Sequence, residues 1–295
     1  MIPNLKSSSD AIRQPLPLSR LLQDTVKIVD ILRLDQLHPV VSGNKWFKLK
    51  YNIEEAAKQG FDRLLTCGGV HSNHLHALAK AGQHFGFKVR ALVRGYADVS
   101  LTPTLKDCLS MGMEIEFLDK KTYAQRYDPL WCLKQAQLHQ SYWIPEGGNN
   151  ELGKMGCEEI AVGCEGYDQV WLSIGSGCTF TGLEQALPAA IELRGVMAIK
   201  GGEELGESLI QAAKCPARCQ IDYEGHLGGF GRCPADLQGL IHHYDALGLP
   251  LDPVYTAKLV AAFEKASMAG ELVGDKRYLL IHSGGLQGRR GVEGL

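Results

Sequence analysis

Lys45 and a distant glycine-rich loop are the parts of the sequence best suited to chemistry. Lys45 lies in the run Ser42-Gly43-Asn44-Lys45-Trp46, a polar and turn-rich stretch where a helix is expected to begin. The second segment, Ser176-Gly177-Cys178-Thr179, follows an expected strand, and backbone N–H groups at such a helix start can bind a phosphate. A lysine that forms a Schiff base, together with an anchor for one phosphate, indicates pyridoxal phosphate as the cofactor.

Lys45 is expected to lose its proton more easily than an ordinary lysine. A cation is disfavoured at a helix N-terminus by the helix dipole, and Lys48 and Lys50 add positive charge nearby. Both effects lower the pKa of the Lys45 amine toward the neutral form that a Schiff base requires. The alternative is that the three lysines form a solvated helix face.

The segment after Cys67-Gly68-Gly69 places three polar side chains at another expected helix start. Ser72, Asn73 and His74 follow the glycine turn in succession. We expect them to face a ligand, because a helix N-terminus presents free backbone N–H groups. The alternative is structural, since serine is a frequent N-cap.

The loop that begins at Gly175 fits one phosphate group better than a nucleotide. Gly175 and Gly177 allow the backbone to approach an anion, and Ser176 and Thr179 add hydroxyl donors. Phe180 breaks the G-x-G-x-x-G dinucleotide fingerprint, and neither a Walker A pattern nor a nucleophile elbow occurs here. A plain strand-to-helix turn is the alternative.

Two further polar segments lie late in the sequence. Asp252-Pro253-Val254-Tyr255 predicts a helix with Asp252 as its N-cap and Pro253 at the first helical position, which leaves Tyr255 unexplained. His282-Ser283 ends the last expected strand in a glycine turn. We predict that His282 is a hydrogen-bonded residue at the strand end and not a base.

The composition is that of an ordinary globular protein. The 295 residues are 45% hydrophobic with a net charge of −2, so no basic excess indicates nucleic acid or a membrane surface as a partner. No apolar run resembles a signal peptide or a membrane span. We therefore expect a cytoplasmic protein.

The nine cysteines predict neither a disulfide framework nor a metal site. Their number is odd, and Cys215, Cys219 and Cys233 fit no zinc pattern with a pair of histidines. Free thiols, buried or partly buried in a reducing cytosol, are the expected state.

Expected strands alternate with expected helices along most of the chain. Strands are predicted at 26–32, 63–67, 89–94, 114–118, 142–144, 170–174, 196–199, 219–223 and 278–281. Helices are predicted at 48–59, 72–85, 102–111, 153–163, 181–193, 203–214, 234–246 and 253–269. This alternation predicts an α/β fold with mostly parallel sheets flanked by helices.

Two glycine-rich junctions, at 42–44 and 146–150, predict crossings between two lobes. We predict a small domain at 47–151, and a large cofactor-binding domain formed by 1–46 and 152–295. Ligands of open α/β sheets lie at the carboxyl ends of the strands, so the cleft between the lobes is the expected site.

Taken together, these motifs resemble the pyridoxal-phosphate enzymes that comprise D-cysteine desulfhydrase and 1-aminocyclopropane-1-carboxylate (ACC) deaminase. This family has the two-domain tryptophan synthase β-like fold, also called fold type II. The motifs are Pro15-Leu-Pro17, Arg33-Leu-Asp35, Gly43-Asn-Lys45, Gly69-Val-His-Ser-Asn-His74, Pro145-Glu-Gly-Gly-Asn149, Gly175-Ser-Gly-Cys-Thr179, Leu251-Asp-Pro-Val-Tyr-Thr256 and His282-Ser-Gly-Gly285. No single motif is specific for this family, but the full set in this order is.

The resemblance implies how the cofactor is held. Lys45 would carry it as a Schiff base, Asn73 would bind its phenolic oxygen, and Thr256 and Ser283 would lie at its pyridine nitrogen. The residues implied for its phosphate are Lys48, Gly175, Ser176, Gly177, Cys178 and Thr179.

The resemblance also implies a substrate site. Ser72, Asn73 and His74 would bind a small amino acid, with Ser72 and His74 at its carboxylate. Tyr255 would face the reacting carbon, so Lys45, Ser72 and Tyr255 form the expected catalytic set. Phe230 stands where the family commonly has tyrosine, which removes a hydroxyl near the substrate.

Two positions distinguish the branches of the family. ACC deaminases carry glutamate after the tyrosine of Asp-Pro-Val-Tyr and leucine before the last Gly-Gly, whereas desulfhydrases carry hydroxyl residues at both. Here these positions are Thr256 and Ser283. A neutral hydroxyl at the pyridine nitrogen gives a weaker electron sink than a carboxylate, which suits loss of a good leaving group.

The leading hypothesis is a lyase of the D-cysteine desulfhydrase type. Lys45 removes the α-proton, the β-substituent leaves, and hydrolysis gives a 2-oxoacid (pyruvate from D-cysteine), ammonia and sulfide. The alternatives are ACC deamination, binding of pyridoxal phosphate or an amino acid without turnover, and a nucleotide-binding oxidoreductase. We also expect a homodimer.

Overall fold

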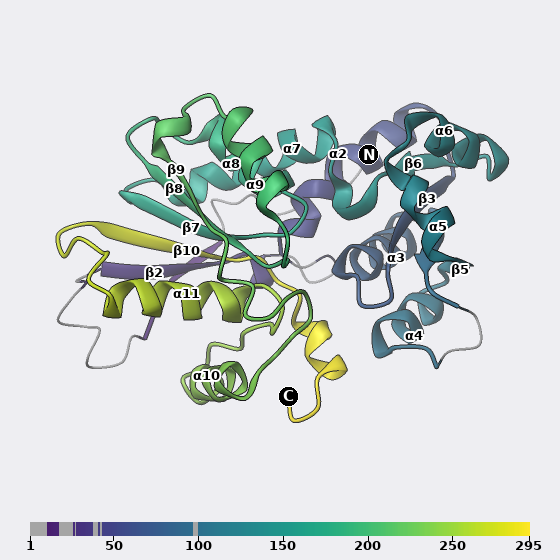
Figure 1. Ribbon diagram of the computed structural model, residues 1–295. Helices are drawn as coiled ribbons and strands as arrows, with labels where there is room; N and C mark the ends of the chain where they lie inside the picture. Colours follow the sequence, from purple (N-terminus) through teal and green to yellow (C-terminus); the bar gives the residue numbers. More distant parts are fainter. Residues whose placement is uncertain (1–10, 18–25, 27, 38–40, 42, 97–99) are drawn as a thin grey trace.

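The computed structural model describes residues 11–17, 26, 28–37, 41, 43–96 and 100–295. Ser42 of the first junction and Lys27 of the first predicted strand lie outside these residues. The chain forms two β-sheets side by side, and helices cover both faces of each (Figure 1).

The larger sheet has six strands in the order β1-β2-β10-β7-β8-β9. They are β1 (Ile12–Pro15), β2 (Ile28–Arg33), β7 (Gln169–Ile174), β8 (Glu192–Met197), β9 (Cys219–Asp222) and β10 (Arg277–His282). Neighbouring strands are parallel except for β1, which is antiparallel to β2.

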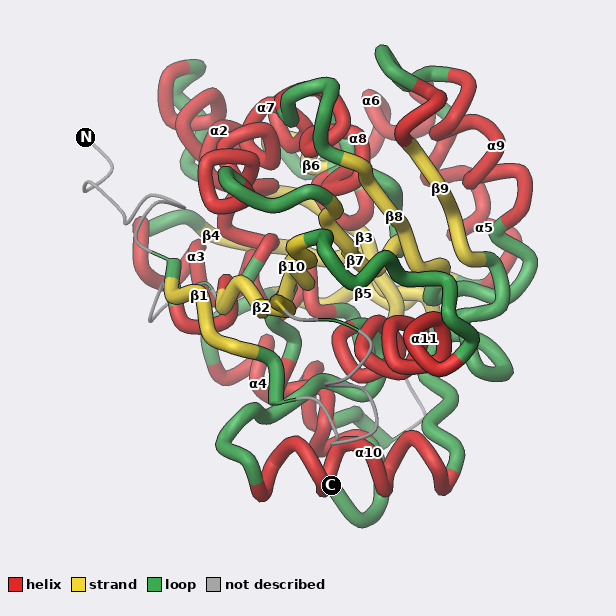
Figure 2. Tube along the Cα trace, turned by 90° about the vertical axis from the view of Figure 1, so that its left-hand side faces the viewer, coloured by secondary structure: helices red, strands yellow, loops and turns green. Residues whose placement is uncertain are grey.

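Helices cover both faces of the larger sheet, and one face carries two layers of them. Helix α11 (Thr256–Met268) lies directly under one face and α10 (Ala235–Ala246) lies under α11 (Figures 1 and 2). In this core Trp171 packs edge-on against Phe263 with ring centroids 5.1 Å apart. The other face is covered by α7 (Glu151–Glu158), η5 (Glu159–Cys164), α8 (Cys178–Ala186) and α9 (Glu203–Gln211).

The smaller sheet has four parallel strands in the order β5-β4-β3-β6. They are β3 (Arg63–Gly69), β4 (Lys88–Arg94), β5 (Glu114–Leu118) and β6 (Tyr142–Ile144). Leu64 faces α3 (Asn73–Phe85) and α4 (Pro103–Ser110), whereas Leu65 faces α5 (Lys120–Ala124) and α6 (Pro129–Leu138). Successive side chains of a strand point to opposite faces, so β3 is buried on both. The remaining short helices are η2 (Leu34–Gln36), η3 (Gln125–Tyr127), η4 (Glu146–Gly148), η6 (Pro216–Arg218) and η7 (Leu286–Gly291).

Helix α2 (Asn44–Lys58) packs in the cores of both sheets. Phe47 is buried in the core of the larger sheet, while Trp46 and Leu49 are buried in the core of the smaller one. The predicted domain boundaries at 46/47 and 151/152 fall inside α2 and α7. The division of the chain at those residues stays a prediction.

The predicted α/β class with mostly parallel sheets is confirmed, and so are eight strands at nearly the predicted positions. The strand predicted at 196–199 is present but begins four residues earlier, as β8 at Glu192–Met197. The helix predicted at 181–193 is wrong in its second half. Helix α8 ends at Ala186, Leu187 is extended with ψ 140°, and residues 192–193 belong to β8. Pro188 explains the error, because the residue before a proline avoids the helical region.

Other elements also differ from the prediction. Strand β1 and helices α5 and α6 were not predicted. Helix α11 begins at Thr256 and not at Pro253, so Asp252 is not its N-cap. The Asp252 carboxylate instead accepts the backbone N–H groups of Val254, Tyr255 and Thr256 at 2.8–3.0 Å, which holds a tight turn before the helix.

The close packing of α7 on α2 gives a test of the fold. A Cβ at Gly156 would lie 1.8 Å from the carbonyl oxygen of Phe47, whereas nothing lies within 4 Å of a Cβ at Gly239 in α10. We expect Gly156→Ala to lower the free energy of unfolding by about 1–3 kcal/mol, because α2 must move away. Gly239→Ala should raise it by about 0.5–1 kcal/mol through helix propensity. Urea unfolding measures both, and equal shifts would contradict the assigned packing.

Candidate active site

The start of α2 is fixed against the end of β10. The backbone N–H of Asn44 donates to the carbonyl oxygen of Ser283 at 3.1 Å. Gly43 has a φ of 69°, and a Cβ there would lie 2.0 Å from the same oxygen, so only glycine fits. Lys45 is therefore placed at the carboxyl edge of the larger sheet, where ligands of α/β folds bind.

Lys45 has the environment of a reactive amine. Its Nζ donates to Asn44 Oδ1 at 2.8 Å and lies 5.7 Å from the centre of the Tyr255 ring. Burial, followed by the positive charge of Lys48, lowers the pKa of the Lys45 amine to about 7. The lowered pKa that the sequence predicted is present, but its largest cause is burial.

Three backbone N–H groups at the start of α8 have no side-chain cap. The N-cap residue is Gly177, which is left-handed with a φ of 82°. Ser176 precedes it, and its Oγ is buried without a hydrogen-bond partner among the described residues. Gly175 passes close to Tyr255, because a Cβ there would lie 3.1 Å from the ring. Free N–H groups beside an unpaired hydroxyl form a suitable cradle for an anion.

The side chains of Cys178 and Thr179 point away from this cradle into the helix packing. Thr179 Oγ1 accepts from Asn44 Nδ2 at 3.0 Å, which ties α8 to the start of α2. The Cys178 thiol donates to the carbonyl oxygen of Gly148 at 3.5 Å and is fully buried. A hydrogen bond from Cys157 lowers the pKa of Cys178 to about 7 against the effect of burial, and Lys48 lowers it further. Both residues can therefore offer backbone N–H groups to an anion.

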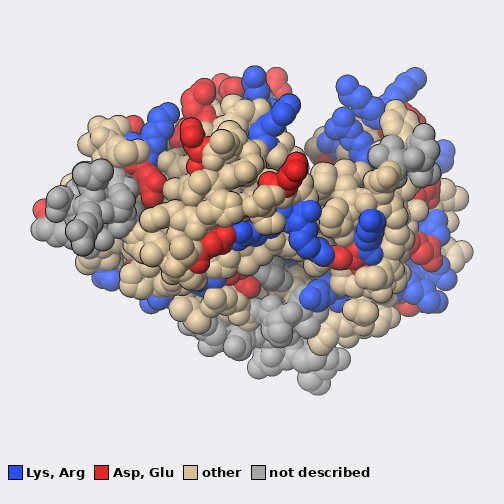
Figure 3. Space-filling view, turned by 90° about the horizontal axis from the view of Figure 1, so that it is seen from below, with Lys and Arg blue, Asp and Glu red and all other residues tan. Residues whose placement is uncertain are grey.

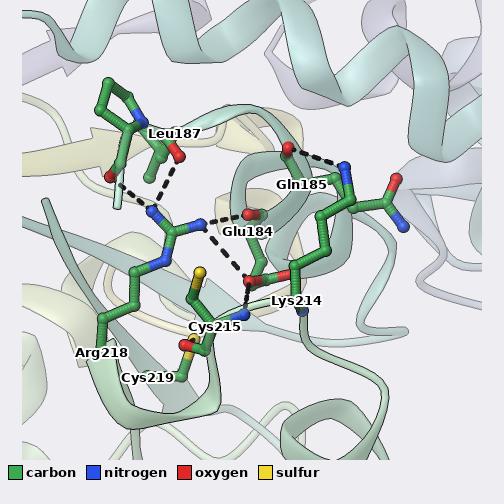
Figure 4. Close-up of polar contacts among 8 residues, drawn as sticks. Glu184, Gln185, Leu187, Lys214, Cys215, Arg218 and Cys219 are labelled. Carbon is green, nitrogen blue, oxygen red and sulfur yellow. Dashed lines mark hydrogen bonds and ion pairs between the residues drawn. The ribbon is translucent and has the colours of Figure 1, made fainter. Parts of the chain in front are cut away.

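Helix α8 is anchored firmly at its other end (Figure 4). The buried Glu184 carboxylate accepts the backbone N–H groups of Lys214 and Cys215 at 3.0 and 2.9 Å. The Arg218 guanidinium donates to the carbonyl oxygens of Glu184 and Leu187. This buried pair fixes the axis of α8, and thus the position of the cradle.

Lys48 places a second cation near the cradle. The Lys48 side chain is 5% exposed. It packs closely on Gly148, since a Cβ added to that glycine would lie 3.0 Å from the Cβ of Lys48. The positive charge of Lys48 contributes to the lowered pKa values of Lys45, His74 and Cys178.

The three polar residues at the start of α3 have different surroundings. Ser72 is the N-cap, since its Oγ accepts from the backbone N–H of Leu75 at 3.3 Å. His74 is 2% exposed, and its Nε2 pairs with Thr66 Oγ1 at 2.8 Å while its Nδ1 has no partner. Burial, with the charges of Lys45 and Lys48, lowers the pKa of His74 to about 3, so the ring is neutral.

Tyr255 and Thr256 border the site from α11. Burial, with the charge of Asp252, raises the pKa of Tyr255, so its phenol keeps its proton. Thr256 is fully buried, and its Oγ1 has no hydrogen-bond partner among the described residues.

Phe230 lies on an exposed glycine-rich loop above Tyr255. It is 51% exposed, and its ring contacts that of Tyr255 edge-on with centroids 6.1 Å apart. The buried Lys258 donates from Nζ to the carbonyl oxygen of Gly229 at 2.7 Å and so anchors the loop. Burial lowers the pKa of Lys258 to about 8.

His282 is a strand-end residue, as predicted. It is the last residue of β10 and is fully buried. Its Nε2 donates to the carbonyl oxygen of Pro250 at 2.8 Å, and its Nδ1 accepts the backbone N–H of Gly284 at 3.2 Å. With both nitrogens engaged, His282 has a structural role.

Several residues at the site were not assigned by the sequence. Asn44 binds both Lys45 and Thr179, Asn149 Nδ2 donates to the carbonyl oxygen of Ser176 at 3.0 Å, and Thr66 pairs with His74. Asn44 and Asn149 lie in the motifs that carry the resemblance. For Asn44, the available signal was a polar residue next to the reactive lysine.

The described residues form no cluster of the kind that binds a metal ion. Among the described residues, no three His, Cys, Asp or Glu side chains could hold a metal ion. All nine cysteines are free, and each is buried or half-buried. Within the described parts of the chain, no helix is long and apolar enough to cross a membrane.

Comparison with known proteins identifies the family. No protein-family model matches the chain. A putative ACC deaminase from Pyrococcus horikoshii is 30% identical over 275 residues, which cover 84% of this chain and 81% of that protein. The chain belongs to the ACC deaminase and D-cysteine desulfhydrase family.

Other relatives of both names support this assignment. A putative ACC deaminase from Thermotoga maritima is 29% identical and covers 95% of this chain and 96% of its own. A D-cysteine desulfhydrase from Klebsiella pneumoniae is 28% identical and covers 94% of this chain and 93% of its own. The family consists of pyridoxal-phosphate-dependent lyases, so the predicted family and enzyme class are confirmed.

Solved structures confirm the fold. An ACC deaminase homologue superposes with a TM-score of 0.79 at 24% identity, over 97% of this chain and 93% of its own. Threonine deaminase isoform 2 from Solanum lycopersicum superposes with a TM-score of 0.67 at 16% identity, over 95% of this chain and 81% of its own. The predicted fold type II architecture is therefore shown.

The lowered pKa of Lys45 has a measurable consequence. With a pKa of about 7, the amine is half neutral near pH 7, whereas an ordinary lysine is half neutral only near about pH 10.4. Labelling of the cofactor-free protein with trace acetic anhydride, mapped by mass spectrometry, should show half-maximal reactivity of Lys45 near pH 7. Lys48→Met should move this midpoint to higher pH by removing a nearby cation. A Lys45 midpoint above pH 9 would contradict the assigned environment.

Proposed function

We propose that the protein binds pyridoxal phosphate through Lys45 and eliminates ammonia and the β-substituent from a small amino acid, as D-cysteine desulfhydrases do. The observation that carries this choice is Thr256, a fully buried hydroxyl with no hydrogen-bond partner in the described part of the chain. The resemblance places a carboxylate at this position in the ACC branch. The overall conversion of D-cysteine and water to pyruvate, ammonia and hydrogen sulfide is balanced.

The described residues fit the cofactor. Uncapped N–H groups at the start of α8 and the unpaired Ser176 hydroxyl suit a phosphate dianion, and Lys48 adds positive charge. The Lys45 amine is close to neutral at physiological pH, as covalent attachment to a carbonyl requires. The unpaired Thr256 hydroxyl can donate to an unprotonated ring nitrogen.

When bound, pyridoxal phosphate supplies an electron sink for the pair of electrons left at the substrate α-carbon. The protein supplies the proton transfers and the orientation. Lys45 Nζ, with its pKa of about 7, accepts the α-proton at neutral pH. Tyr255 keeps its phenolic proton and can donate it to a departing sulfur atom. Ser72 and the neutral His74 offer polar contacts to the substrate carboxylate without placing another charge beside Lys45.

ACC deamination is the second candidate, because relatives named ACC deaminase match over most of the chain. Opening the ring gains nothing from a departing thiolate and needs a stronger electron sink. A hydroxyl at Thr256 and another at Ser283 supply no negative charge to keep a ring nitrogen protonated. Cytoplasmic location and a homodimer stay predictions.

The assignment of Lys45 can be tested directly. The purified protein should be yellow, and borohydride reduction should fix the cofactor to Lys45 in a digest. Lys45→Ala should lose turnover by at least about a thousandfold, because the base proposed for the α-proton is removed. Lys50→Ala is a suitable control, since Lys50 pairs with Glu159. A reduced adduct on Lys48 or Lys258 would show that the site is misassigned.

The reaction can be tested with D-cysteine, L-cysteine, β-chloro-D-alanine and ACC in parallel. We expect pyruvate from D-cysteine or the chloro compound and almost none from ACC. Thr256→Glu combined with Ser283→Leu should shift the ratio of ACC to D-cysteine turnover by about tenfold or more, or about 1.4 kcal/mol. Vigorous ACC turnover by the unaltered protein would refute the choice of elimination.

Thr256→Val removes the buried hydroxyl and keeps the shape of the side chain, so it tests the role of the hydroxyl alone. An unpaired buried hydroxyl costs about 1–3 kcal/mol, so valine should raise the free energy of unfolding of the cofactor-free protein. The same variant should lower elimination, because the donor is lost. A variant that is less stable and fully active would show that the hydroxyl has another role.

A further inference from the structure

The short helix η7 contacts helices that cover the two different sheets. Arg289 forms a two-pronged ion pair with Asp245 of α10, with one contact at 2.7 Å. Arg290 forms another with Asp107 of α4, with one contact at 3.3 Å. Figure 1 shows this segment in yellow between α10 and α4. Seen from below, basic side chains lie between acidic ones where the two halves of the molecule meet (Figure 3).

The same segment also contacts Asn73 at the start of α3. Gln287 Nε2 donates to Asn73 Oδ1 at 2.8 Å. A Cβ added to Gly285 would lie 2.4 Å from Asn73 Nδ2, which is too close. The backbone at residue 285 can therefore pass Asn73 only because Gly285 has no side chain. The Asn73 amide is thus held by the backbone on one side and by a hydrogen bond on the other.

We propose that residues 286–291 are an interdomain clasp, and that Gln287 is a positioning residue that sets the orientation of the Asn73 amide. A donor at Gln287 keeps Oδ1 turned toward the clasp, so Nδ2 is the atom left to donate to a ligand. The part that concerns the cofactor rests on the proposed function, in which Asn73 donates to the phenolic oxygen. The clasp itself rests on the contacts alone.

The charges of the clasp are partly exposed, which predicts sensitivity to salt. The side chains of Arg290 and Asp107 are 49% and 29% exposed, and those of Arg289 and Asp245 are 18% and 29% exposed. Hydrogen bonds from Arg290 and Arg289 hold the pKa values of Asp107 and Asp245 below their usual range. Each pair is weak alone, but together the two adjacent arginines hold one short segment to both α10 and α4.

The first test measures the affinity of the cofactor-free protein for pyridoxal phosphate by equilibrium dialysis. Gln287→Glu keeps the shape of the side chain, but a carboxylate can only accept hydrogen bonds. The Asn73 amide should then rotate so that Nδ2 faces residue 287 and Oδ1 faces the cofactor. We expect the Kd to rise about tenfold, and about threefold for Gln287→Met, which removes the constraint without reversing it. In an Asn73→Ala background neither change should have a further effect, which separates orientation from the added charge.

The second test measures the link between the two lobes without any cofactor. Small-angle X-ray scattering should show a larger radius of gyration for Arg290→Glu, and the reciprocal pair Arg290→Glu with Asp107→Arg should restore it. His76 lies 3.2 Å from Asp107, but burial lowers its pKa, so it tolerates a cation there. High salt should enlarge the radius of the unaltered protein and not that of Arg290→Glu.

The outcomes separate this inference from the proposed function. Equal Kd values for Gln287→Glu and Gln287→Met, or an effect that persists in Asn73→Ala, would overturn the positioning role. An unchanged radius for Arg290→Glu in a folded variant would overturn the clasp. If Lys45→Ala stays active, the proposed function fails while the scattering result still decides the clasp.

Discussion

The half-buried side chain of Lys45, with its lowered pKa, is the constraint on which the site depends. An ammonium ion is stable in water, and moving it into the interior favours the neutral amine, here with a pKa of about 7. A flexible lysine would turn back to solvent. The chain prevents this by fixing the two residues that precede Lys45, with Gly43 against Ser283 and Asn44 against Thr179. The reactive amine is therefore a consequence of packing between α2, β10 and α8.

The same packing brings helix starts from both sheets to one place. Helix α3 begins where β3 ends, α8 begins where β7 ends, and α2 begins beside the end of β10. Each start presents backbone N–H groups and the positive end of a helix dipole. These favour a phosphate or a carboxylate, and they disfavour the charged form of Lys45. One arrangement thus attracts an anionic ligand and helps to keep the amine neutral.

Sequence patterns predicted the elements whose signals are local. Alternating burial and runs of apolar residues located nine strands, and the glycine turns located the starts of α3 and α8. Helix α6 was missed because it buries none of its residues, so no apolar face marks it. Strand β1 was missed because it is a short edge strand that is largely exposed. The start of α11 was misplaced because Asp252 holds a turn that precedes the helix and lies four residues before its first residue, Thr256.

Contacts between distant segments had no local signal. The bond from Gln287 to Asn73 joins residues 214 positions apart, and that from Asn44 to Thr179 joins residues 135 apart. The residue types indicated only that these side chains are polar and that they lie in or near the motifs of the site. The family motifs indicated which positions to examine, but not which atoms would be paired.

The unpaired polar atoms show where the folded chain is incomplete by itself. Of six buried side-chain atoms without partners among the described residues, three belong to residues predicted for the site: Ser176 Oγ, Thr256 Oγ1 and His74 Nδ1. Each costs the folded state about 1–3 kcal/mol, because its hydrogen bonds to water are lost without replacement. Elsewhere buried groups such as Glu184 and His282 find several partners, so the chain is able to satisfy them. A ligand that pairs these three atoms recovers this free energy as binding affinity, which links the low stability of the site to its function.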